Sequence, residues 1–175
     1  MFFLPWWCKI PIFEEKWGVA MGKLLDTVGC KILEILQEEG RISYNDLATR
    51  VGLSSPAVAD RIKKMEEQGI IKGFRAVVNY PEIGYGITVF VRIVLPANKV
   101  PILEELAKNV PEIIETYHVT GTDGMILKII SGSMERLEEI LRDVAIHGVT
   151  NTSLILSSPV NGKVVQPLNS KHSND

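Results

Sequence analysis

Cysteine is scarce in this chain of 175 residues, which contains only Cys8 and Cys30. Two cysteines without a metal-binding spacing exclude both a disulfide framework and a cysteine-rich zinc site. Such sparing use of cysteine is typical of a reducing compartment, so we expect a cytoplasmic location. The hydrophobic content of 46% excludes a mostly disordered protein, and the length suffices for two small domains.

Histidine is also rare, and His118 and His147 are the only histidines outside the C-terminal tail of the sequence. No Ser/His/Asp set and no pair of carboxylates suited to acid–base catalysis is apparent. We therefore predict that the protein is not an enzyme and that it has no catalytic residue, no metal site and no cofactor. We interpret His118 as a packed or interface side chain.

A membrane-spanning segment is not expected. The most apolar segment, residues 1–20, contains all three tryptophans, but Pro5, Lys9 and Pro11 interrupt it and it is too short to cross a bilayer. It also lacks the small-residue cleavage pattern of a secretory signal. Because Met21 stands just before the first helical pattern, we expect residues 1–20 to reflect a misassigned start codon. A membrane-surface anchor is the alternative.

The net charge of −2 gives no overall basicity that would indicate nucleic acid. Positive charge is local instead: residues 55–75 hold five Lys/Arg against three Asp/Glu, whereas residues 76–175 hold eight against eleven. A local basic patch can bind phosphates with salt-sensitive affinity while the rest of the chain stays acidic.

That basic segment lies within residues 41–75, which carry the pattern of two short helices joined by a tight turn. Ser43 precedes an amphipathic stretch, and Gly52 supplies the chain reversal on which helices commonly end. Either Ser54 or Ser55 can then accept a hydrogen bond from the first free amides of a new helix. Such a short turn makes the helices cross steeply, so that the second projects from the body of a domain.

The second helix of this pair has an inner face of Val58, Ile62 and Met65 at helical spacing, which leaves its outer face free to meet DNA. Its exposed N-terminal end suits phosphate contact, because unpaired backbone N–H groups point at an anion there. The predicted DNA contacts are Ser54, Ser55, Pro56, Ala57, Ala59, Asp60, Arg61, Lys63, Lys64, Lys72 and Arg75.

These candidates differ in what they would contact on DNA. Ala57 and Ala59 allow close approach to base edges or a thymine methyl, whereas the four basic residues other than Arg61 mostly neutralise phosphates. Asp60 either repels phosphate or accepts a hydrogen bond from a cytosine amino group, and both interpretations stay open. Base specificity is therefore poorly encoded. In the alternative interpretation, Lys63 and Lys64 merely solvate a surface helix.

The flanking segments complete a domain. Apolar residues from Leu25 to Leu36 form a helical stripe that ends at Gly40, and this first helix supplies the core that two short helices lack. After Gly69, an extended stretch runs through Val78. Together these segments predict a winged helix-turn-helix domain over residues 21–78, followed by a linker at 79–84.

The second half of the chain has the order βαββαβ. The predicted elements are a strand at 87–95, a helix at 100–110, strands at 112–120 and 125–130, a helix at 137–144 and a strand at 149–156, with residues 163–165 as a fifth, edge strand. This order predicts an α+β fold, a ferredoxin-like sheet over residues 85–166 with two helices on one face. The polar tail, residues 167–175, is expected to be disordered.

The other face of this sheet would stand open unless a partner covers it. Both faces of the first strand include large apolar residues such as Phe90 and Val94. We therefore predict a homodimer formed through this domain. A dimer would also bring two reading helices to half-sites one helical turn apart on double-stranded DNA.

The sequence stretches LLDTVGCKILEILQEEGRISYNDLATRVGLSSPAVADRIKKMEEQGIIKGFRAVVN and YHVTGTDGMILKI resemble the Lrp/AsnC, or feast/famine, transcription regulators over about residues 24–157. The resemblance implies a cytoplasmic regulator of promoter DNA that forms dimers and often octamers, and that responds to a small-molecule effector, usually an amino acid. Gly29 and Cys30 depart from the family pattern. A mid-helix glycine costs about 1 kcal/mol relative to alanine, so we expect a locally softer first helix.

The resemblance also implies an effector site at the turn between the second and third strands of the sheet, for which the candidates are Gly121, Thr122, Asp123, Gly124 and Met125. Asp123 could pair with an ammonium group, and the free amides around Gly121 and Gly124 could bind a carboxylate. The alternative is a simple hairpin connection rich in turn-forming residues.

Two other functions remain open at this point. Sirohaem decarboxylases share the two-domain architecture, although the sequence Tyr117-His118-Val119 lacks the His-Asn-Tyr signature associated with them. A DNA-architectural protein of low specificity would carry the same helix pair but would protect DNA uniformly in footprinting.

Overall fold

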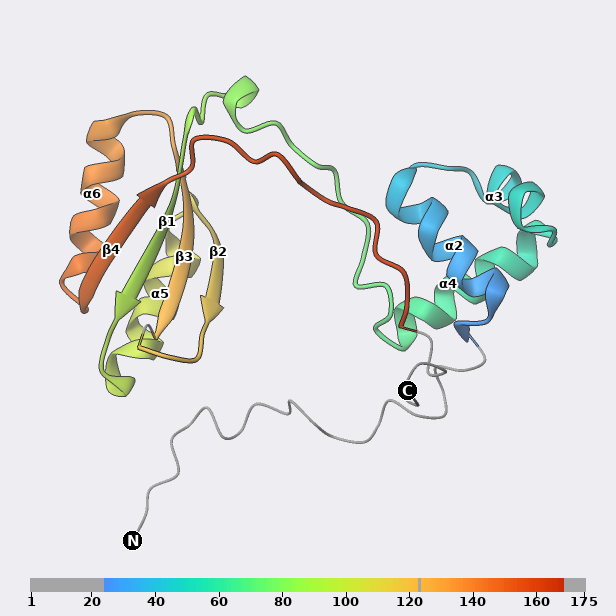
Figure 1. The fold of residues 1–175 in the computed structure, drawn as a ribbon, viewed down its shortest axis with the longest axis horizontal. Coiled ribbons are helices and arrows are strands. Elements are labelled where there is room, and N and C mark those ends of the chain that lie inside the picture. Colours follow the sequence, from blue (N-terminus) through green and yellow to red (C-terminus); the bar gives the residue numbers. More distant parts are fainter. Residues whose placement is uncertain (1–23, 123, 169–175) are drawn as a thin grey trace, which may run out of the picture. The chain divides into compact units, whose positions relative to one another are not determined.

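The computed structural model describes residues 24–122 and 124–168 (Figure 1). The predictions for residues 1–20 and for the tail beyond Leu168 lie outside this range. The chain divides into two compact units. We call the described residues 24–76, together with 162–168, the helical unit, and we call Val77–Asn161 the sheet domain.

Within the described residues, the helices of this unit are α2 (Thr27–Glu38), α3 (Tyr44–Val51) and α4 (Ser55–Glu67). Asp26, Ser43 and Ser54 cap them, each side chain accepting a backbone N–H three residues further on. Gly52 ends α3 in the left-handed conformation at φ 71°, as predicted. The cap residues and the apolar spacing thus define the helix-turn-helix locally.

The helices pack around one small core, in which Ile32, Leu47, Val58, Ile62 and Met65 are fully buried. The predicted inner face of the second helix of the pair is confirmed by this burial. After α4, the chain turns by N–H donation from Ile70 and Ile71 to the carbonyl oxygen of Met65. Residues 72–79 then continue without strand pairing in the described chain, so the wing is an open extended segment.

The sheet domain has the predicted βαββαβ order. Its elements are β1 (Ile87–Val94), α5 (Val100–Asn109), β2 (Ile113–His118), β3 (Met125–Ser131), α6 (Met134–Ala145) and β4 (Val149–Leu154), with short 3-10 turns at Pro81–Ile83 and Ala97–Lys99. All strand pairs are antiparallel, in the order β2-β3-β1-β4. The α+β class is confirmed.

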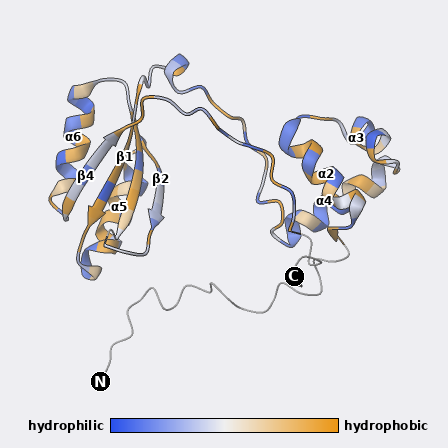
Figure 2. Cartoon of the chain, viewed as in Figure 1, coloured by the Kyte–Doolittle hydropathy of each residue, from blue (hydrophilic) through white to orange (hydrophobic). Residues whose placement is uncertain are grey.

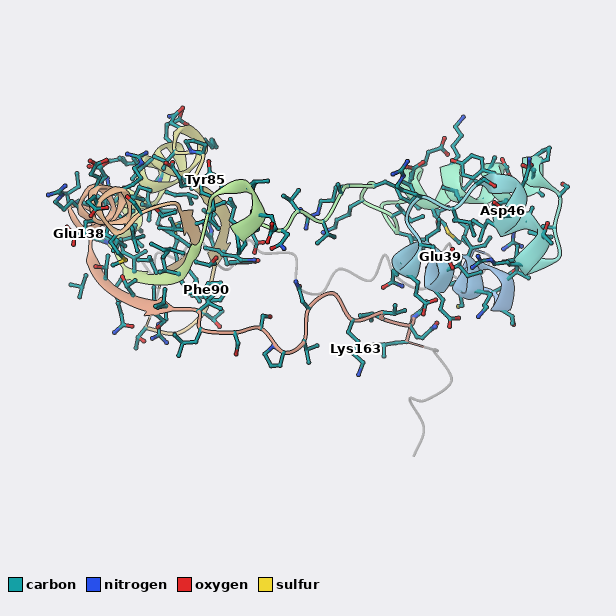
Figure 3. All side chains as sticks on the ribbon, turned by 90° about the horizontal axis from the view of Figure 1, so that it is seen from above. Glu39, Asp46, Tyr85, Phe90, Glu138 and Lys163 are labelled. Atoms are coloured by element: carbon teal, nitrogen blue, oxygen red, sulfur yellow. The ribbon has the colours of Figure 1, made fainter. Side chains whose placement is uncertain are left out.

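The side chains of β1 point alternately to the two faces of this sheet. Val89, Val91 and Ile93 are buried in a core that α5 and α6 complete, whereas Phe90 and Val94 on the opposite face are exposed. Figure 2 shows hydrophobic and hydrophilic residues alternating around α6, as a helix with one buried side requires. In Figure 3, Phe90 lies on the side of the sheet opposite to Glu138 of α6.

The prediction of a fifth strand at residues 163–165 is wrong. The Val165 N–H donates to Gln37 Oε1 and the Val165 carbonyl oxygen accepts from Gln37 Nε2, each at 3.0 Å. The main-chain groups of Val165 are thus bound by a side chain of α2 and not by a sheet edge. Residues 162–168 accordingly group with the helical unit.

Candidate DNA-binding and effector sites

The turn between α3 and α4 is short and internally bonded. The Leu53 N–H donates to the carbonyl oxygen of Ala48 at 3.0 Å, and the Val58 N–H donates to that of Ser54 at 3.1 Å. The Ser54 hydroxyl accepts from the Ala57 N–H, which identifies Ser54 as the cap between the two predicted alternatives. These bonds fix where α4 begins and therefore which of its side chains face outward.

The outer face of α4 carries the predicted mixture of small and charged residues. Asp60, Lys63 and Lys64 are exposed, as is Pro56, while Ser55, Ala57 and Ala59 are partly exposed. Small side chains beside charged ones allow the helix axis to approach a groove closely. This face is the candidate base-reading surface.

The basic residues of α4 are paired within the chain. Lys64 Nζ lies 2.6 Å from Asp60 Oδ2, and Lys63 Nζ lies 3.8 Å from Glu67 Oε1. In each of these exposed ion pairs the two partners lie one helical turn apart. Such pairs contribute little to stability and can exchange partners. Their pairing lowers the net positive charge that α4 offers to phosphate.

Lys72 and Arg75 lie on the extended segment after α4, and both are exposed. Neither has an ion-pair partner among the described residues. They are therefore the cations of this surface best placed to neutralise phosphate without first giving up an internal contact.

Arg61 differs from the other candidates. Its guanidinium forms a bidentate pair with Asp26, with Nη1 2.7 Å from Oδ1 and Nη2 2.8 Å from Oδ2. Hydrogen bonds from Arg61, and then from the Gly29 amide, hold the pKa of Asp26 below its usual value, while Asp26 raises the pKa of Arg61. Asp26 thereby caps α2 and also ties it to α4. This role of Asp26 was not predicted from the sequence, although an aspartate just before a helical pattern is a capping signal.

Gly29 lies in the first turn of α2, because the helix begins at Thr27. The expectation of a soft mid-helix glycine is therefore wrong. A Cβ atom on Gly29 would lie 1.7 Å from the carbonyl oxygen of Leu24 and 3.1 Å from Met65 Cε. Gly29 is the residue that lets the preceding backbone pack against α2 beside α4.

The candidate effector turn connects β2 to β3. Gly121 has φ 107°, a conformation that other residues rarely adopt, and Thr122 is exposed. Asp123 lies outside the described residues. The expectation that the Gly124 amide is free is wrong, because its N–H donates to the carbonyl oxygen of Ile93 at 2.9 Å. A Cβ on Gly124 would also lie 2.9 Å from Leu95 Cδ2, so this end of the turn is pinned to β1.

Met125, the last of the predicted effector residues, begins β3 and is fully buried in the core of the sheet domain. His118 of β2 lies opposite Met125 in the register of β2 and β3. The His118 Nε2 atom lies 3.0 Å from Glu104 Oε1 of α5. His118 is nevertheless an exposed residue, so its interpretation as a packed or interface side chain stays a prediction.

Within residues 24–122 and 124–168, no cluster of His, Cys, Asp and Glu could hold a metal ion. Over the same residues, no helix combines the length and the apolar character that crossing a bilayer requires.

The open face of the sheet is apolar at several neighbouring positions. Phe90 is 37% exposed, Val94 46% and Val149 76%, and Val94 lies opposite Val149 in the register of β1 and β4. Arg92 on the same face is bonded to Asn151 at 2.8 Å. An exposed apolar surface of this kind is typical of a protein interface.

Two family models match the chain. A winged helix-turn-helix DNA-binding model matches residues 25–72, and the Lrp/AsnC ligand binding domain matches residues 88–165. The HTH-type transcriptional regulator FL11 of Pyrococcus furiosus is 37% identical over 139 residues, which cover 78% of this chain and 92% of that protein.

Solved structures agree with these matches. The transcriptional regulator NMB0573 of Neisseria meningitidis, in complex with L-Met, has a TM-score of 0.75 and 25% identity, and the alignment covers 83% of this chain and 97% of that one. AsnC of E. coli has a TM-score of 0.72 and 28% identity, with 82% and 99% covered.

Proposed function

Because the chain belongs to the Lrp/AsnC family of DNA-binding transcriptional regulators, we propose that it binds promoter DNA through the outer face of α4 and the extended segment that follows. The observation that carries this assignment is the capped α3–turn–α4 unit, which buries one face of α4 and leaves the other exposed. The family consists of transcription regulators and not of enzymes, which removes the decarboxylase alternative.

In this proposal, the contacts divide into two kinds. The side chains around Ala57 and Asp60 face base edges in the major groove, while Lys72 and Arg75 contact phosphates. We leave Arg61 out of the DNA contacts, because its guanidinium is engaged by Asp26.

We propose further that two copies associate through the open face of the sheet. The exposed apolar side chains of Phe90, Val94 and Val149 support this assignment, since burying them removes apolar surface from water. A dimer places two copies of α4 against one DNA molecule, which compensates for the few base contacts that each helix offers.

Sedimentation velocity tests the dimer. Phe90→Asp introduces a charge into the centre of the proposed interface and should convert the protein to monomers. Met134→Asp is the control, because Met134 is also an exposed apolar residue, at 55% against 37% for Phe90, but lies on α6. Equal behaviour of the two variants would contradict this interface.

For the effector, we propose that an amino acid binds at the β2–β3 turn, with methionine the first candidate because the related structure from Neisseria meningitidis was solved with L-Met. Gly121, Thr122 and Asp123 remain the proposed contacts. The buried Met125 and the bonded amide of Gly124 would support the turn from beneath.

Calorimetry against all twenty amino acids tests the effector proposal. A specific heat for one or a few of them, reduced by Thr122→Val, is the expected outcome. Absence of heat from all twenty, with no change in assembly size, would contradict it.

The regulatory role is tested by locating genomic binding sites with and without the amino acid that gives heat. Discrete enriched sites near promoters are expected. Uniform coverage of the genome would favour a DNA-architectural protein of low specificity.

A further inference from the structure

Asp60 occupies an unusual place for an acidic residue. Between residues 55 and 67, the other acidic residues, Glu66 and Glu67, lie at the C-terminal end of α4, whereas Asp60 lies in its N-terminal half. In helix-turn-helix proteins, that half of the second helix faces the base edges. An isolated carboxylate there would meet a strongly negative groove, so its presence calls for a compensating contact or a specific partner.

The compensating contact is Lys64. Its Nζ lies 2.6 Å from Asp60 Oδ2, and the two side chains remain 52% and 58% exposed, respectively. One bond does not saturate either group, because a carboxylate accepts several hydrogen bonds and an ammonium has three donors. The pair therefore offers an acceptor and a donor side by side, with its net charge cancelled.

This arrangement is complementary to one base pair in particular. The major-groove edge of C·G presents the cytosine N4 amino donor at one end and the guanine O6 and N7 acceptors at the other. On A·T, the adenine N6 donor lies between two acceptors, N7 and the thymine O4, which would repel a carboxylate. The pair of a carboxylate and an ammonium thus fits C·G better than A·T, where the charged carboxylate would lie between two acceptors.

The surroundings on α4 permit the approach. Ala57 and Ala59, beside Asp60, carry no atoms beyond Cβ, so they do not hold the helix away from the groove. Lys64 lies one helical turn further along the same side, where its longer chain can reach across a base pair.

We propose that Asp60 and Lys64 together read one C·G pair in each half-site, with Asp60 accepting from the cytosine amino group and Lys64 donating to guanine O6 or N7. This inference rests on the proposed entry of α4 into the major groove. It makes Asp60 a specificity-determining residue, and the opposing hypothesis is that the charge of Asp60 merely repels phosphate.

Selection from a random DNA library, followed by affinity measurements on the enriched sites, tests the pair. For the wild-type protein, replacing the C·G pair should weaken binding about 5- to 150-fold, as one mismatched contact does. Asp60→Asn should shift the preference at that position to A·T, because an amide pairs with adenine N6 and N7. Asp60→Ala should flatten the preference there, and Lys64→Ala should weaken the selection for guanine.

Glu67→Gln is the matched control. It removes the same charge from the second ion pair of α4, that with Lys63, but at the other end of the helix. It should leave the selected sequence unchanged. All these side chains are exposed, and the melting temperature of each variant checks that the fold is retained.

The outcomes separate this inference from the proposed function. If Asp60→Ala tightens binding to every sequence and leaves the selected site unchanged, Asp60 merely repels phosphate and the inference is wrong. If the wild-type protein binds DNA without any preference, the inference fails while DNA binding stands. If it binds no DNA under any condition, the proposed function fails as well.

Discussion

The helical unit and the sheet domain each expose one face, but the chemistry of the two faces is opposite. The outer face of α4 carries charges, most of which are paired within the chain, as between Lys64 and Asp60. The open face of the sheet carries apolar side chains such as Phe90 and Val149. Contacts of the first kind are salt-sensitive and exchangeable, whereas contacts of the second kind depend on burial from water. In the proposed function, one chain thus separates a salt-sensitive DNA-binding surface from an apolar dimer surface.

The largest effect is expected from core substitutions that destabilise one unit and leave the other folded. Ile62→Ala removes a fully buried side chain from the small core of the helical unit and should lower its free energy of unfolding by about 2–5 kcal/mol. DNA binding should be lost while the dimer persists. Leu127→Ala in the core of the sheet domain is the converse variant and should weaken the dimer first. Urea unfolding and sedimentation measure both, and simultaneous loss of both functions in each variant would contradict independent units.

Gly29→Ala should come next, with a loss of about 1–3 kcal/mol from overpacking. Its Cβ would lie 1.7 Å from the backbone of Leu24, so either that backbone or α2 must shift. Gly40→Ala is the matched control, because its Cβ would meet an ordinary contact at 3.7 Å. Thermal unfolding of the helical unit compares them, and equal melting temperatures would show that the Leu24 segment is not held as the structure has it.

Removing Lys72 and Arg75 tests the proposed DNA-binding surface itself. The double variant Lys72→Ala, Arg75→Ala should bind all DNA sequences more weakly and should reduce the slope of log affinity against log salt by about 2, or about 0.9 per phosphate contact. Lys108→Ala with Arg142→Ala changes the same charges on the sheet domain. Fluorescence anisotropy over a salt series measures both slopes, and an equal decrease in the control would indicate a nonspecific charge effect.

The smallest expected effect concerns Asp26. Its folded-state pKa is lowered, chiefly by the hydrogen bonds from Arg61. Its charge therefore stabilises the fold above the unfolded pKa of about 3.9, and this contribution is lost as the pH falls through the folded value. Because the side chain is 42% exposed, we expect the contribution to be below about 1 kcal/mol.

Asp26→Asn keeps an oxygen for the cap but removes the charge, which should flatten the acid limb of the unfolding free energy of the helical unit. Asp46→Asn, which changes another exposed aspartate of the same unit, is the control. An acid limb as steep as that of the wild-type protein would exclude a role for the Asp26–Arg61 pair.

The fold could be predicted from the sequence wherever the signal lies within a few neighbouring residues. The cap at Ser43, a second cap at Ser54 or Ser55, the left-handed Gly52 and the apolar spacing of α4 located the helix pair, because each acts within a few residues. Alternation in β1 likewise predicted a sheet with one buried face.

The contacts that sequence reasoning missed join residues far apart. Arg61 meets Asp26 across 35 residues, and Gln37 meets Val165 across 128. Such pairs depend on how helices and segments pack, which no local pattern encodes. The same holds for the Gly124 amide, which looked free in the turn but is bonded to β1.

The two hydrogen bonds between Gln37 and Val165 have a consequence for folding during synthesis. A ribosome delivers α2, α3 and α4 first, then the elements of the sheet domain, and Val165 only after them. The three helices can fold early, since their core contains no residue beyond Ile71. The hydrogen bonds between Gln37 and Val165, however, can form only after the sheet domain, which lies between these two residues in the chain, has been translated. In a nascent chain the three helices therefore lack the Gln37–Val165 hydrogen bonds until Val165 has emerged.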